Sequence, residues 1–158
     1  MGVQPGPEHK RLAALVGRWR TEGWTRGTAE VPPARIDAVD TYSWLPGRFA
    51  LLHTVDALVG EEQVDGAEII GWDPARNAYV TQYFGSDGAN AYEANLQDEG
   101  GVLVWTMRSH SDRFVGTFGE NGHTLEGHWE QLDSEKNWQP WMDVRLTRQE
   151  PGDPGTAG

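Results

Sequence analysis

The stretch VLVWTMRSHSDRFVGTFGENGHTLEGHWEQL, residues 102–132, decides the fold. It contains three runs in which apolar residues, many of them aromatic or β-branched, alternate with polar ones, as in strands with one buried face. Asn121-Gly122 separates the second run from the third, and this dipeptide is typical of a two-residue hairpin turn. His110-Ser111 separates the first run from the second. The stretch therefore predicts three consecutive antiparallel strands.

The two turns also predict the register, because a two-residue loop fixes which residues face each other across a hairpin. The predicted inner pairs are Phe118 with Leu125, Gly116 with Gly127, Phe114 with Trp129, Met107 with Phe114, Trp105 with Gly116 and Leu103 with Phe118. The outer face is polar and holds Arg113, Thr117, Thr124, Glu126, His128 and Glu130. Both hairpins thus bury the same apolar face.

Similar runs extend in both directions from this stretch, separated about every ten residues by turn signals. The predicted strands are 18–26, 35–45, 48–58, 64–72, 78–86, 89–97, 102–109, 112–120, 123–132 and 140–149. With Asp87-Gly88 as a loop, Tyr83 faces Tyr92 and Thr81 faces Ala94, while the outer face holds Gln82, Glu93 and Asn95. Ten antiparallel strands with one apolar face predict an all-β meander closed into a barrel, because closure removes exposed edges.

The ends of the chain frame this barrel. Pro7 begins a helix over residues 7–16, with Gly17 as its C-cap, and the helix is expected to cover one end of the barrel. We predict a single barrel domain over residues 1–149. Residues 150–158, EPGDPGTAG, lack an apolar anchor and predict a disordered tail.

Composition excludes several functions. Asp and Glu outnumber Lys and Arg by 24 to 13, for a net charge of −11, which disfavours nucleic acid and anionic membrane surfaces as partners. The chain has no Cys, so it has neither disulfides nor thiolate metal sites. The His residues are at positions 9, 53, 110, 123 and 128, without a pair suited to metal binding, and we predict no metal and no cofactor. No signal peptide or spanning segment is evident, so cytoplasmic residence is expected.

Four segments carry a resemblance to a known superfamily: VGRWRTEG at 16–23, WLPGRF at 44–49, IIGWD at 69–73 and YFGS at 83–86. The first contains the Gly-x-Trp signature of calycins. The pattern is similar to lipocalins, to ten-stranded nitrobindin-like and fatty-acid-binding barrels, and above all to a bacterial lipocalin-like family of unknown function. The resemblance implies that Trp19 packs at the closed end of the barrel beneath Arg145 or Arg148 of the last strand.

Nitrobindin-like proteins bind haem through a His close to the C-terminus. The last predicted strand, 140–149, contains no His. The resemblance therefore does not carry haem binding over to this chain, and His53 is the one substitute left open.

The second and third predicted strands contain the pair of residues that most strongly suggests acid–base chemistry. With Pro46-Gly47 as the loop, Asp40 faces His53 inside the barrel, close enough for the carboxylate to raise the pKa of the imidazole. His53 and Asp40 are therefore the candidate catalytic residues, His53 as a general acid or base. The alternatives are a satisfied polar pair lining a wet cavity, or a bulge that turns one of the two outward.

A further carboxylate belongs to the same region. Glu68 points inward near Tyr83 if Trp72 faces Tyr79, and its pKa would then be raised by desolvation. In the opposite phase of that strand, which is also apolar, Glu68 lies on the solvent face.

The remaining inner residues predict a pocket wall. The candidate ligand-binding residues are Tyr42, Trp44, Leu51, Glu68, Tyr83, Tyr92, Trp105, Phe114 and Trp129. Gly116 and Gly127 would leave space opposite Trp105 and Trp129, which suits a planar apolar ligand. The alternative is plain core packing, which is hard to extend across a ten-stranded lumen.

The leading functional hypothesis is non-catalytic binding of a hydrophobic small molecule, such as a lipid, a polyketide-like metabolite or a tetrapyrrole. The first alternative is a cofactor-free enzyme in which His53 and Asp40 move a proton during isomerisation, cyclisation or hydrolysis. The second is a structural or interaction protein with a filled barrel. Homodimer formation is left open by the sequence.

Overall fold

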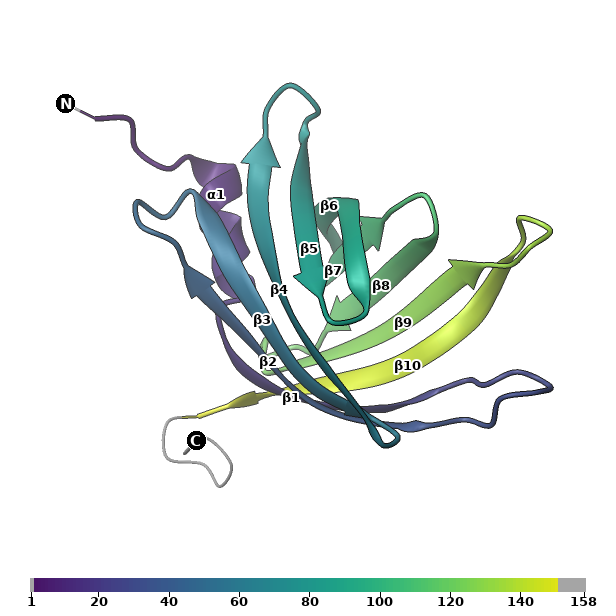
Figure 1. The fold of residues 1–158 in the computed structure, drawn as a ribbon. Helices are drawn as coiled ribbons and strands as arrows, with labels where there is room; N and C mark the ends of the chain where they lie inside the picture. The colour runs from purple at the N-terminus through teal and green to yellow at the C-terminus, as the bar shows by residue number, and fades with distance from the viewer. Residues whose placement is uncertain (1, 151–158) are drawn as a thin grey trace.

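The computed structural model describes residues 2–150, and in it ten antiparallel strands form a closed barrel (Figure 1). Each strand pairs with its neighbour in the chain, and the last pairs with the first. The strands are β1 (Gly17–Thr25), β2 (Arg35–Trp44), β3 (Ala50–Val59), β4 (Glu62–Asp73), β5 (Ala78–Gly85), β6 (Gly88–Glu99), β7 (Val102–Arg108), β8 (Asp112–Phe118), β9 (Thr124–Leu132) and β10 (Trp138–Gln149). The predicted ten-stranded barrel is confirmed. The predicted tail lies, apart from Glu150, outside the described residues.

The hairpins of β7, β8 and β9 have the predicted register. Phe118 pairs with Leu125, and Phe114 with both Met107 and Trp129. Gly116 of β8 pairs with Trp105 of β7. These turns were predictable because each dipeptide occupies the centre of its loop.

The register predicted between β5 and β6 is wrong by two residues. Gly85 pairs with Gly88, so Ser86 and Asp87 form the turn in place of Asp87-Gly88. Tyr83 therefore faces Asn90 instead of Tyr92. Because a shift of two preserves the alternation, Tyr83 and Tyr92 still share the inner face.

A short helical segment covers one end of the barrel (Figure 1). Helix α1 (Pro7–Arg11) continues into the 3₁₀ turn η1 (Leu12–Ala14), so the helix predicted over residues 7–16 ends early. Gly17 begins β1 and is not a helix cap. Leu12 is fully buried, and the hydroxyl of Tyr79 donates a hydrogen bond of 2.6 Å to the Glu8 carbonyl. Of the described helices, none is long and apolar enough to cross a membrane.

The packed end of the barrel, which we call the plug, consists of α1, η1 and the buried side chains around them. Trp19 of β1 and Arg148 of β10 connect the first and last strands of the sheet to the plug. Trp19 is 1% exposed, and its indole nitrogen donates to the Leu15 carbonyl at 2.8 Å. The Arg148 guanidinium lies 4.2 Å from the centroid of the Trp19 ring, a cation–π contact. Arg148 also donates to the carbonyls of Ala14 and Val16. Arg145 instead pairs with Glu126, so Arg148 is the arginine of the two that covers Trp19.

We expect Trp19→Ala to lower the free energy of unfolding by about 3–5 kcal/mol, because it removes a buried ring and leaves a cavity. Trp24→Ala on the same strand is the matched control, since Trp24 is 53% exposed. The control should change stability by only about 0.5 kcal/mol. Urea denaturation monitored by circular dichroism measures both changes, and equal losses would contradict the assigned role of Trp19.

Candidate functional site

A cavity of about 390 Å³ lies inside the barrel. Its apolar wall includes Ile36, Val55, Ala57, Val64, Met107 and Leu146. The end that α1 covers is instead packed with large side chains, among them Leu12, Leu15, Trp19 and Ile70. A barrel of ten strands is too wide for side chains to fill completely, which is why a lumen remains beyond this plug.

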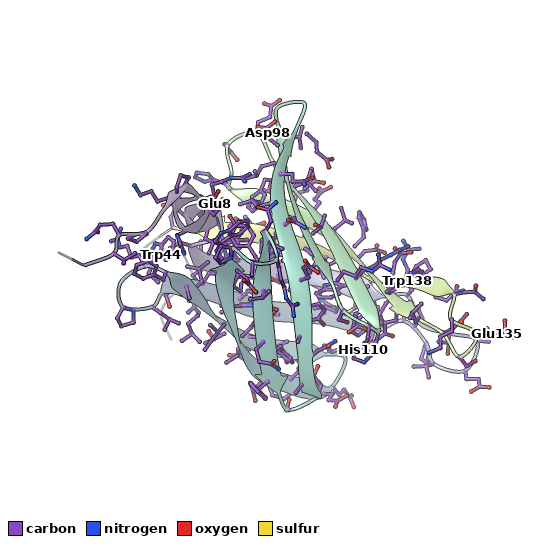
Figure 2. All side chains as sticks on the ribbon, turned by 90° about the horizontal axis from the view of Figure 1, so that it is seen from above. Glu8, Trp44, Asp98, His110, Glu135 and Trp138 are labelled. Atoms are coloured by element: carbon purple, nitrogen blue, oxygen red, sulfur yellow. The ribbon has the colours of Figure 1, made fainter. Side chains whose placement is uncertain are left out.

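Most of the predicted wall residues line this cavity: Tyr42, Glu68, Tyr83, Tyr92, Trp105, Phe114 and Trp129. Two others do not. Leu51 is fully buried in the packed cluster with Leu12 and Leu15, and Trp44 packs against that cluster. Figure 2 shows Trp44 and Glu8 toward one end of the molecule and His110 and Glu135 toward the other. Trp44 and Leu51 therefore belong to the plugged end.

The space expected above Gly116 and Gly127 is occupied by the Phe114 ring. A Cβ atom on Gly127 would lie 2.2 Å from Phe114, and one on Gly116 would lie 2.8 Å from it. These glycines therefore seat an aromatic side chain of the wall. They do not enlarge the cavity, contrary to the expectation from the sequence.

The predicted direct pairing of Asp40 with His53 is wrong by two residues. Tyr42 pairs with His53, and Asp40 pairs with Val55. The reason is the loop: Pro46 and Gly47 are the centre of a turn closed between Leu45 and Arg48, and the whole connection spans residues 45–49. The shift of two leaves Asp40 and His53 on the inner face.

His53 nevertheless lies between two carboxylates. Its Nε2 is 2.7 Å from Asp40 Oδ1, and its Nδ1 is 2.9 Å from Glu68 Oε1. The three residues come from adjacent strands β2, β3 and β4, and each is at most 9% exposed. Of the two orientations considered for Glu68, the structure shows the one in which its side chain points into the barrel. We call Asp40, His53 and Glu68 the polar cluster.

The second oxygen of each carboxylate also accepts a hydrogen bond. The Thr21 hydroxyl donates to Asp40 Oδ2 at 2.5 Å, and the Thr81 hydroxyl donates to Glu68 Oε2 at 2.7 Å. From the sequence, Thr81 was expected on the inner face, but neither threonine was assigned to the site. Strand alternation was the available signal, since Thr21 lies two residues beyond Trp19 and Thr81 two residues before Tyr83.

The cluster holds His53 in its charged form. Burial alone would lower the pKa of His53, but hydrogen bonds and charge attraction from Asp40 and Glu68 outweigh burial and raise the pKa to about 9. His53 is therefore an imidazolium at neutral pH, with both N–H groups donating to carboxylates. The Tyr42 ring stacks on it, with centroids 4.0 Å apart and planes at 6°.

Tyr42 completes the site with a neutral hydroxyl. Burial, followed by the nearby charges of Asp40 and Glu68, raises the pKa of Tyr42 well above its ordinary value. Both ring nitrogens of His53 are engaged by carboxylates, so neither is free as a metal ligand. Within residues 2–150, no group of three or more His, Asp or Glu side chains is arranged to hold a metal ion.

The barrel is similar to two solved structures. The crystal structure of Rv2717c from M. tuberculosis superposes with a TM-score of 0.71 at 13% identity, covering 92% of this chain and 99% of that chain. The S-type phycobiliprotein lyase CPES from Guillardia theta superposes with a TM-score of 0.60 at 8% identity, covering 90% and 93%. At these identities the likeness shows the fold alone. No curated protein matches the chain.

The sequence also matches one family model over residues 4–140, which includes the plug, the polar cluster and nine of the ten strands in full. That model describes proteins of unknown function. The chain therefore belongs to the family of proteins of unknown function DUF1579.

Proposed function

We propose that this protein binds a small molecule with a largely apolar body inside its barrel. The observation that carries the proposal is the cavity of about 390 Å³, which is walled mainly by apolar and aromatic side chains and borders the polar cluster. Ligand sites in proteins commonly have volumes of roughly 300–1,000 Å³, with a few polar groups that fix orientation.

The aromatic part of the wall favours a ligand with a flat face. Trp129 is the centre of a set of rings, with centroid distances of 4.9 Å to Phe114 and 5.9 Å to both Tyr92 and Trp141. All four residues line the cavity. A planar ligand can stack on such rings or meet their edges, which adds to the energy of apolar burial.

The polar cluster favours binding over proton transfer. Each N–H of His53 already donates to a carboxylate, so a bound molecule has no direct path to either proton. The raised pKa also leaves the imidazole without a free lone pair at neutral pH. His53 and Asp40 therefore act in this proposal as part of the recognition surface.

We expect N-phenyl-1-naphthylamine, a neutral aromatic probe whose fluorescence rises in apolar surroundings, to bind this protein. Ala57→Trp should weaken that binding at least about tenfold, because Ala57 is 6% exposed and lines the cavity. Leu58→Trp is the matched control, since Leu58 lies on the outer face of the same strand and is 44% exposed. Fluorescence titration measures all three affinities.

Circular dichroism must show that Ala57→Trp is folded, and Ala38→Phe is a second cavity-filling variant if it is not. Equal probe binding by the wild type and a folded cavity-filling variant would place the binding outside the cavity and contradict the proposal. Native mass spectrometry of freshly purified protein is an independent check, because a carried ligand appears as added mass.

The charge state of His53 is a separate prediction. NMR titration of its ring should give a pKa well above the ordinary value of about 6.5. The groups that face the ring are Asp40 and Tyr42 from β2 and Glu68 from β4. Asp40→Asn should lower the His53 pKa, because it removes one of two opposite charges. Asp37→Asn, on the outer face of the same strand, is the control.

The raised pKa of His53 also makes the stability of the folded protein depend on pH. A pKa raised in the folded state stabilises it fully below the unfolded value of about 6.5, and this contribution is lost as pH rises through about 9. The wild type should therefore lose more stability over this range than His53→Gln does. Parallel pH profiles for the two proteins, measured by urea denaturation, would refute the assigned charge state.

A further inference from the structure

The charges that line the cavity are almost entirely negative. Its wall includes the carboxylates of Asp40, Glu62, Glu68 and Asp87, while the described lining residues include neither Lys nor Arg. His53 is the one titratable cation among these lining residues, and it is shared between two carboxylates. With these three groups ionised, the polar cluster carries a net charge of −1.

The cluster also has more acceptors than donors. Each of the four carboxylate oxygens accepts one hydrogen bond from His53, Thr21 or Thr81. A carboxylate oxygen has room for a further hydrogen bond, whereas both N–H groups of His53 are already used. A bound group that donates hydrogen bonds therefore finds partners on both carboxylates, whereas His53 offers no unused N–H to a group that only accepts.

The Tyr42 hydroxyl is a second, independent sign of a ligand. Tyr42 is 9% exposed and lines the cavity, yet its hydroxyl makes no hydrogen bond to any other residue within 2–150. The Tyr42 oxygen is not one of the fully buried side-chain polar atoms that lack a partner, so it is reachable from the cavity. It is therefore open to a hydrogen bond with a molecule inside the cavity. Its ring stacks on His53, which places the hydroxyl beside the polar cluster.

We propose that the cavity selects an apolar molecule that bears a protonated amine, and that it discriminates against carboxylic acids. The amine donates hydrogen bonds to the Tyr42 oxygen and to the carboxylates of the polar cluster, while the apolar body lies against the aromatic wall. This inference rests on the proposed binding function and adds the class of ligand. A carboxylate in the same place would meet like charges in an apolar enclosure, which is unfavourable.

Three naphthalene compounds that share one ring system test this selectivity: 1-naphthylmethylamine, 1-naphthalenemethanol and 1-naphthoic acid. Each is used at pH 7 to displace N-phenyl-1-naphthylamine from the wild-type protein. We expect the amine to displace the probe at a concentration at least about tenfold lower than the acid, with the alcohol between them. Displacement by the acid at the same concentration as by the amine would overturn the inference. Failure of the probe itself to bind would instead overturn the proposed function.

Variants locate the origin of the selectivity. Glu68→Gln should reduce the difference between the concentrations at which the amine and the acid displace the probe, a difference that we call the gap. Tyr42→Phe should weaken the binding of the amine and of the alcohol while the probe still binds. Asp37→Asn removes the same charge from the outer face of β2, where Asp37 pairs with Arg20, and should leave the gap unchanged. If Asp37→Asn narrows the gap as much as Glu68→Gln does, selectivity comes from the overall charge of −11 and the cavity assignment is wrong. Asp40→Asn is the second cluster variant if Glu68→Gln does not fold.

Discussion

The pairing of β1 with β10 is the contact on which the rest of this structure depends. It runs from Arg18 opposite Gln149 to Thr25 opposite Met142 and closes the sheet on itself. Without it, two long strands would expose unpaired backbone groups to other chains. Arg148 strengthens the closure from β10, because it covers Trp19 and binds carbonyls of the segment that leads into β1.

Closure with ten strands has a consequence for the interior, because a barrel of this size encloses more space than its side chains fill. The plug of α1, Trp19 and their neighbours fills one end, and the remaining volume becomes the cavity. The polar cluster lies in the inner layer that borders this volume. Buried charges are tolerated only when they are paired and hydrogen-bonded, and here every carboxylate oxygen has a donor.

Turn chemistry explains how much of this could be predicted. Asn121-Gly122 is the middle of the loop between Gly119 and Thr124, so the register predicted from it is right, although the turn itself closes between Gly119 and Gly122. Pro46-Gly47 forms a turn within a longer loop, and Asp87-Gly88 lies one position past its turn, so both predicted registers were displaced by two residues. Even displacements preserve faces, which is why Asp40, His53 and Glu68 were expected inside.

Alternation in a strand reports which face a residue occupies but not its height along the barrel axis. Leu51 and His53 share a face, yet Leu51 belongs to the plug and His53 to the cavity. That height depends on strand tilt and on contacts between distant segments, such as Tyr79 with Glu8, which no local pattern encodes. Thr21 and Thr81 were missed as partners of the polar cluster for the same reason, because alternation indicates their face but not the carboxylate that each one meets.

The polar cluster is difficult to explain as a stabilising device. Replacing buried ion pairs with well-packed apolar residues is often neutral or stabilising, because desolvation offsets the attraction between the charges. A barrel that needed only stability would be served by apolar residues at positions 40, 53 and 68, as it is at Leu51 and Ile70 nearby. The cluster instead places an excess of acceptors and an unpartnered Tyr42 hydroxyl against an aromatic wall. Recognition of a donor-bearing ligand accounts for both features, with the wall contributing affinity and the cluster contributing selectivity.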